Sequence, residues 1–182
     1  MTSTTGLFYE LLSKKPEITI TSKDQTHPKI WKLLSKILFI LSFGKLKTFL
    51  TSFTTTVGHT IYFPVGWHVD DANCEDYEIL CHELVHVTRM EKLGFGNIVL
   101  GTIVFGFLYF LVPFPVFFAW FRYQFEREAY KVSWYVEQEQ GLNPEIDAYV
   151  LDLTGLDYLW PWIFRTQVKR WLMKNCKVFK AS

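Results

Sequence analysis

The stretch Ile-Leu-Cys-His-Glu-Leu-Val-His-Val, residues 79–87, decides how the rest of the chain is interpreted. His82 and His86 stand four residues apart, so on a helix both imidazoles project from one face and can reach a single metal ion. Glu83 follows the first histidine, where its carboxylate can polarise a water molecule instead of binding the metal. The residues around these three are uncharged, which is typical of a helix packed against a core. The stretch therefore predicts a buried helix with a metal-binding face.

Composition limits the kind of protein that surrounds this helix. The 182 residues are enough for one domain with an appendage and a sizeable core. The net charge is +1, and because Lys and Arg are spread along the chain there is no basic stripe that would favour nucleic acid. Aromatic residues make up 18% of the chain against 20% charged residues. Such a chain has either a large apolar core or an apolar surface that a membrane or a protein partner covers.

The cysteines and the first residues bear on the compartment. Cys74, Cys81 and Cys176 lack CxxC spacing, so they predict neither a disulfide framework nor a thiolate zinc site, and they favour a reducing setting. The segment 1–10 has no basic flank followed by an apolar run, so we expect no secretory signal.

Local patterns predict an α+β fold in three parts. Residues 1–29 are polar and read as an N-terminal arm, mobile or bound to a partner, with one short helix at 7–12. Residues 141–182 read as a helical, aromatic-rich extension. The metal-binding domain between them, 30–140, is expected to contain a helix at 30–43, an antiparallel hairpin of strands 49–57 and 60–64, the motif helix from about residue 74 to before Gly94, and a long helix at 119–140. In the extension, helices are expected at 145–152 and 158–175.

An uncharged segment, 93–121, separates the two long helices. Its hydropathy is that of a membrane-spanning candidate, but a single crossing would put any later metal ligand on the opposite side of the bilayer from His86. Two crossings need about 40 residues, more than the segment offers. Pro113 and Pro115 also interrupt it. We therefore expect an apolar hairpin that folds back, either packed in the core or covered by a partner, or dipped into a membrane face.

A catalytic zinc ion needs a third protein ligand. Residues 122–130 offer two carboxylates, Glu126 and Glu128, which flank the buried face of the second long helix from opposite sides. Periodicity does not choose between them, and either can equally be a solvated charge.

A motif helix followed by a helix with Glu-x-x-Ala resembles the gluzincin metallopeptidases, especially the minigluzincins, and the HtpX/Ste24-type peptidases. The resemblance covers about residues 30–140 and implies a zincin-like domain. It implies that His82, His86 and Glu126 bind one zinc ion and that Ala129 is the small residue one turn later. The chain departs from the family at Tyr130, where the family has an Asp that orients a zinc-binding histidine.

The function implied by the resemblance is that of a zinc metalloendopeptidase. Glu83 would be the general base for water attack on a peptide carbonyl, and the substrate would pair with the edge strand at 60–64. A second hypothesis is a structural or assembly protein, in a virion or at a membrane, that retains the fold with an occluded or inactive site. In either case the segment 93–121 and the Trp-rich tail are candidate contacts with a membrane surface or a protein partner. For Trp171 and the pair at 160 and 162, a cap on the core is an equal alternative.

The remaining polar residues near the motif are weaker candidates. His59 and His68 are expected to be ordinary loop histidines, because a pair of ligands is already supplied. Tyr123 and Tyr130 are possible oxyanion donors or packing residues. Cys81 is expected to be a buried structural thiol.

Overall fold

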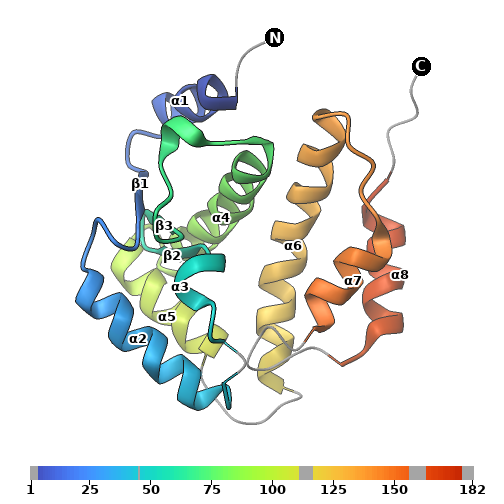
Figure 1. The fold of residues 1–182 in the computed structure, drawn as a ribbon. Helices are drawn as coiled ribbons and strands as arrows, with labels where there is room; N and C mark the ends of the chain where they lie inside the picture. Colours follow the sequence, from blue (N-terminus) through green and yellow to red (C-terminus); the bar gives the residue numbers. More distant parts are fainter. Residues whose placement is uncertain (1–3, 45, 111–116, 156–162, 178–182) are drawn as a thin grey trace.

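A computed structural model describes residues 4–44, 46–110, 117–155 and 163–177. Helices surround a small three-stranded sheet, so the predicted α+β class is confirmed (Figure 1). In chain order the described elements are α1 (Thr4–Lys14), β1 (Thr19–Ser22), α2 (Pro28–Leu41), α3 (Phe49–Ser52), β2 (Thr55–Val57), β3 (Thr60–Phe63), the 3-10 helix η1 (Val69–Asp71), α4 (Cys74–Leu93), α5 (Ile98–Phe110), α6 (Phe117–Glu139), α7 (Ile146–Thr154) and α8 (Arg165–Asn175).

The sheet has the order β1-β3-β2. Strands β2 and β3 form the predicted antiparallel hairpin, but its first strand is shorter than expected because residues 49–52 form α3. The apolar side chains of this region recur at helical spacing and pack against Trp31 of α2, which favours a turn of helix over an extended strand. Because β3 is central, it cannot be the edge strand that the sequence predicted for residues 60–64.

The prediction that residues 1–29 form a separate arm is wrong for the part that the structure describes. Strand β1 pairs in parallel with β3, with Ile20 opposite Ile61, and so completes the sheet. Helix α1 buries Phe8 completely, and the Phe8 ring lies 6.4 Å from Phe63 and 5.9 Å from Tyr77. The polar composition of the segment concealed these few apolar anchors.

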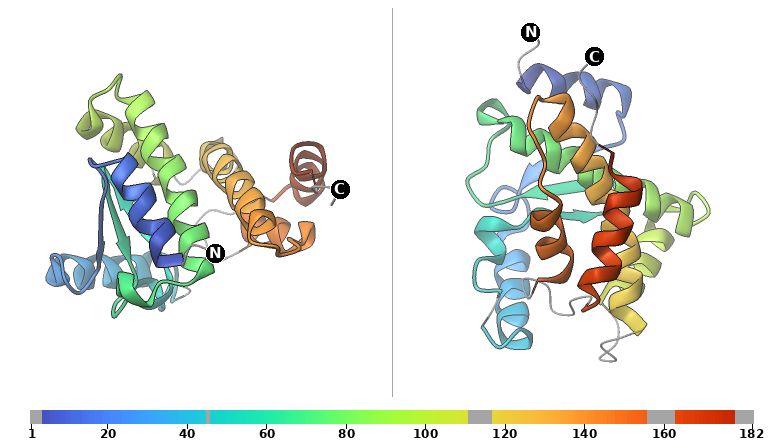
Figure 2. Two further views of the ribbon diagram at one scale, coloured as in Figure 1. Left: turned by 90° about the horizontal axis from the view of Figure 1, so that it is seen from above. Right: turned by 90° about the vertical axis from the view of Figure 1, so that its right-hand side faces the viewer.

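The two faces of the sheet are covered by different helices (Figures 1 and 2). On β3 the side chains alternate, so that Ile61 and Phe63 enter the main core with α1 and α4, whereas Tyr62 faces α2 and contacts Trp31 at 4.7 Å. The sheet therefore separates a core that includes the motif helix from a smaller core beneath α2 and α3.

Helix α4 begins and ends where the sequence predicts. Asn73 and Asp76 form a reciprocal capping box at its N-terminus, with both hydrogen bonds at 3.0 Å. Gly94 follows the last helical residue, and α5 starts after a sharp bend of 108°. In the described ranges no single helix has the length and hydropathy needed to cross a membrane, although α4 and α5 up to Tyr109 pass that criterion when they are taken together.

The described part of the segment 93–121 consists mainly of helix α5 and the start of α6. Helix α5 packs against α4 and α6, with Phe105 stacked on Phe125 at 4.8 Å. The opposite face of α5 is exposed, including Val99, Ile103 and Phe107. Residues 111–116, with both prolines, lie outside the described residues.

Helices α6, α7 and α8 form a second core. Helix α6 lies between α7 and α8 on one side and the rest of the fold on the other (Figures 1 and 2). Its centre contains Trp134 and Tyr149, whose rings are 5.5 Å apart. Trp171 is partly buried and packs against this core beside Arg127, which agrees with the alternative of a cap on the core. Residues 160–162 lie outside the described residues.

Replacement of Gly101 by Ala should destabilise the fold, because the added Cβ would lie 1.8 Å from the carbonyl oxygen of Met90, where α4 and α5 cross. We expect the free energy of unfolding to fall by at least about 2 kcal/mol in a chemical denaturation experiment. Gly106→Ala is the matched control in the same helix, since its Cβ would meet no atom within 4 Å. It should be neutral or stabilising by about 0.5–1 kcal/mol. Equal stability of the two variants would contradict this account of the crossing.

Candidate metal centre

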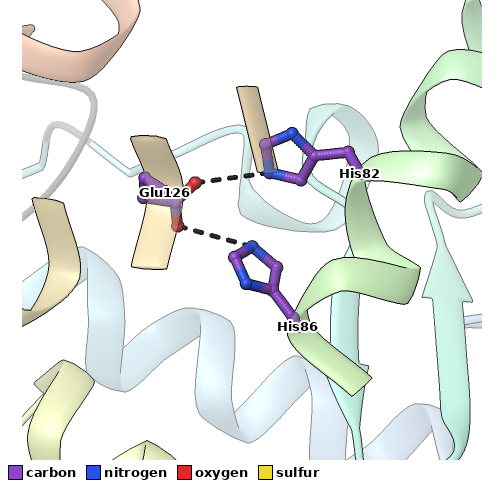
Figure 3. A group of neighbouring side chains, drawn as sticks. All are labelled: His82, His86 and Glu126. Carbon is purple, nitrogen blue, oxygen red and sulfur yellow. Dashed lines mark ion pairs between the residues drawn. The ribbon is translucent and has the colours of Figure 1, made fainter. Parts of the chain in front are cut away.

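Three polar side chains meet between α4 and α6 (Figure 3). His82 and His86 project from the same face of α4, and Glu126 projects towards them from α6. Nε2 of His82 lies 3.3 Å from Oε2 of Glu126, and Nε2 of His86 lies 3.7 Å from Oε1. One ligand atom from each residue lies within 4.8 Å of the others, so the group could bind a metal ion.

The structure distinguishes Glu126 from Glu128, the two carboxylates that helical periodicity could not separate as candidates for the third ligand. Glu126 is 3% exposed and faces both histidines. Glu128 is half-buried, and its carboxylate lies 3.5 Å from Nε of Arg127. Residues 126 and 128 stand on different sides of the helix, so only the first is directed at α4.

Burial and the neighbouring charges shift the pKa values of these three residues in opposite directions. Burial opposes the ionisation of Glu126, but the neighbouring His86 and His82 outweigh it and lower the pKa of the carboxyl to about 2. For His82, burial opposes protonation, but the hydrogen bond and charge of Glu126 raise its pKa. For His86 burial prevails, and its pKa falls below the ordinary value. At neutral pH the carboxyl of Glu126 is therefore ionised and the neutral form of His86 is favoured, as cation binding requires.

A second layer of polar residues orients the three side chains. Nδ1 of His82 lies 3.3 Å from Oγ of Ser133, whereas its Nε2 faces Glu126. A hydroxyl that accepts from Nδ1–H leaves Nε2 of His82 as the ligand atom. On the other side, the Tyr109 hydroxyl of α5 donates to Oε1 of Glu126.

Glu83 lies beside the group, and a hydrogen bond from strand β2 fixes its carboxylate. The Thr56 hydroxyl on β2 donates to Oε2 of Glu83 at 2.6 Å. Behind it, Lys23 is fully buried, and its ammonium donates to the carbonyl oxygens of Phe49 and Phe53. Burial lowers the pKa of Lys23 to about 8, partly offset by the charge of Glu83. The candidate base thus faces a fixed hydroxyl and a buried cation.

Sequence reasoning did not find Ser133, Tyr109, Thr56 or Lys23. The signal for Ser133 was present, because it is a polar residue on the buried face of α6, two turns after Glu126. For the other three the chain offers no local signal, since their partners come from distant elements.

The remaining histidines do not join the group within the described part of the chain. His59 pairs instead with Glu91, with 3.0 Å between Nε2 and Oε1. His68 precedes η1. Both agree with the prediction of ordinary loop histidines.

The two candidate tyrosines and the cysteine have packing roles. The Tyr130 ring meets His82 edge-on at 4.8 Å, so it shields the imidazole. Tyr123 belongs to the second core, next to Arg127. Burial raises the pKa of Cys81 to about 11, which keeps it a thiol, as expected of a structural residue.

The geometry and the donor set both fit a metal ion. Ligand atoms about 2.1 Å from one tetrahedral ion are about 3.4 Å apart, and with one ligand atom from each residue the three atoms here lie within 4.8 Å of one another, so small side-chain movements would bring them to one ion. Oε2 of Glu126 is also buried without a hydrogen bond of normal geometry among the described residues. Such an atom favours a cation at this position.

Comparison with protein-family models, with curated proteins and with solved structures found no match for the chain.

Removal of the carboxylate should abolish metal binding. We expect Glu126→Gln to weaken zinc affinity by more than about 100-fold in a competition titration with a chelating dye, because a ligand is lost and not merely a supporting residue. Glu128→Gln, two residues later on a different side of the same helix, is the matched control and should bind as wild type does. If Glu128→Gln loses zinc and Glu126→Gln retains it, the assignment of the ligand is wrong.

Loss of the Ser133 hydroxyl should weaken zinc binding by about tenfold without abolishing it, because the hydroxyl only orients His82. The measurement is zinc affinity of Ser133→Ala, together with the ¹⁵N chemical shifts of the His82 imidazole. In wild type the shifts should report Nδ1–H as the protonated nitrogen of the neutral ring. Unchanged shifts and affinity in the variant would show that Ser133 does not set the tautomer.

Proposed function

We propose that this chain is a zinc-dependent metallopeptidase with a zincin-like domain. The observation that carries the proposal is the convergence of His82, His86 and Glu126 from two helices, with Glu83 next to the first histidine and beside the group. Two imidazole nitrogens and one carboxylate oxygen are a donor set that zinc uses in hydrolases.

The number of ligands supports a catalytic centre over a purely structural one. Structural zinc sites usually have four protein ligands, whereas catalytic sites have three and keep one position for water or substrate. Within the described residues the group contains three.

Each residue has a distinct part in peptide hydrolysis. A bound zinc ion would supply Lewis acidity, lowering the pKa of water towards about 7 and polarising the substrate carbonyl. Glu83 accepts the proton of the attacking water and delivers it to the leaving amine. The Thr56 hydroxyl keeps the Glu83 carboxylate in one orientation, and Ser133 and Tyr109 keep His82 and Glu126 in place.

The strand next to Glu83 favours an extended peptide as the substrate. Strand β2 is an edge of the sheet, it packs against α4, and its Thr56 contacts the candidate base. An extended peptide that pairs with β2 would run past Glu83. This edge replaces residues 60–64 in the proposal.

One observation favours the second candidate, a structural or assembly protein with an occluded site. The side chains of His82, His86 and Glu126 are only 13%, 8% and 4% exposed. A substrate carbonyl must approach through the narrow exposed part of His82 or after a movement of neighbouring elements. The two functions differ in the consequence of replacing the base.

Glu83→Gln should retain zinc and lose peptidase activity by about 100-fold or more, because general-base catalysis typically contributes that much. The measurement pairs zinc content with cleavage of a broad peptide library. Glu75→Gln is the matched control, an exposed carboxylate at the start of the same helix. If wild type and Glu83→Gln both bind zinc and neither cleaves any peptide, the peptidase proposal fails and the structural function is favoured.

A further inference from the structure

Helix α2 has an exposed apolar stripe that no described element covers. Its inner face buries Trp31 and Leu38 against the sheet. On the outer face the side chains at 30, 33, 37 and 40 recur at helical spacing. These side chains are Ile30 (61% exposed), Leu33 (60%), Ile37 (44%) and Ile40 (71%). Helix α2 lies at the lower-left margin of the molecule in Figure 1, with its outer side open.

A stripe of lysines borders this apolar stripe. Lys29, Lys32 and Lys36 precede the exposed apolar residues by one position each, so they occupy the adjacent strip of the helix surface. None of the three forms an ion pair with any residue in the described ranges. From Asp24 to Asp70 the sequence contains five lysines and no acidic residue between the two aspartates. The outer face of α2 is therefore cationic and apolar, with no anion of its own.

We propose that α2 binds the protein to the surface of an anionic lipid bilayer. The helix would lie in the plane of the interface, with Ile30, Leu33, Ile37 and Ile40 in the boundary between headgroups and acyl chains. The lysines would extend their alkyl stems along the same boundary and place their ammonium groups at lipid phosphates. Charge complementarity selects this occupant, because a second copy would bring its own lysines against these three.

The other basic helix does not present the same surface. Helix α8 has several cationic side chains, but Lys169 is paired with Asp147 of α7 at 2.5 Å. Met173 is an exposed apolar residue near its C-terminal end, whereas the exposed Ile163 and Phe164 precede the helix, so these residues form no stripe along it. The lipid proposal does not depend on zinc or on peptidase activity, so it can fail or succeed separately from the proposed function.

The experiment measures cosedimentation of the full chain with vesicles of phosphatidylcholine alone and of phosphatidylcholine mixed with phosphatidylglycerol. Wild type should bind the mixed vesicles more tightly and lose affinity as salt is added. The triple variant Lys29→Glu, Lys32→Glu, Lys36→Glu should lose at least about 100-fold in affinity for them, because each lysine near an anionic surface contributes about fivefold and the new carboxylates are repelled. The matched control reverses three exposed charges of α8, Arg165→Glu, Arg170→Glu and Lys174→Glu, which gives the same net charge. It should bind nearly as wild type does.

A second variant tests the apolar stripe. Ile37→Ser with Ile40→Ser removes exposed side chains only, so the fold should persist, and binding to the mixed vesicles should weaken by about tenfold. Equal affinity of wild type for both vesicle types, or equal losses in the α2 and α8 charge variants, would overturn the proposal. A dimer in solution that the α2 variants dissociate would also overturn it, since a second copy would then cover this face.

Discussion

The structure depends on a buried carboxylate that must be matched by two imidazoles. An ionised group inside an apolar core is very unfavourable unless charge and hydrogen bonds compensate it. Glu126 receives that compensation from His82 and His86 across the interface between α4 and α6, and from Tyr109 of α5. The bend after α4 and the close crossing at Gly101 bring α5 alongside α4, where its Tyr109 reaches this carboxylate.

Local sequence patterns were sufficient for features that depend on neighbouring residues. The four-residue spacing of His82 and His86, the ends of α4 and the hairpin of β2 and β3 were all predictable, because each follows from backbone periodicity or turn chemistry. The choice of Glu126 over Glu128 was not, since both residues flank the same buried face. It depends on the direction from which α4 approaches, which only tertiary packing determines.

Contacts between segments that are distant in the sequence could not be predicted from hydrophobic periodicity. The Ser133 hydroxyl and His82 are 51 residues apart, and Thr56 and Glu83 are 27 apart. The N-terminal segment was predicted to be an arm for the same reason, because the partner of β1 is β3, which lies far away in the sequence. Lys23 shows the limit most clearly. Lysine is nearly always exposed, and its burial here is explained by tertiary contacts, namely the carbonyl oxygens of Phe49 and Phe53 and the rings of Trp31 and Phe49.

The position of the polar group between two hydrophobic cores has a consequence for cooperativity. The two histidines belong to α4, which packs in the main core, whereas α6 also contributes Tyr123 and Trp134 to the core of the last three helices. A ligand that binds the folded group and not the unfolded chain adds stability to the contact between the two cores. With metal bound, the two cores would then unfold together as one cooperative unit. Without metal, the C-terminal helices would unfold as a unit of their own.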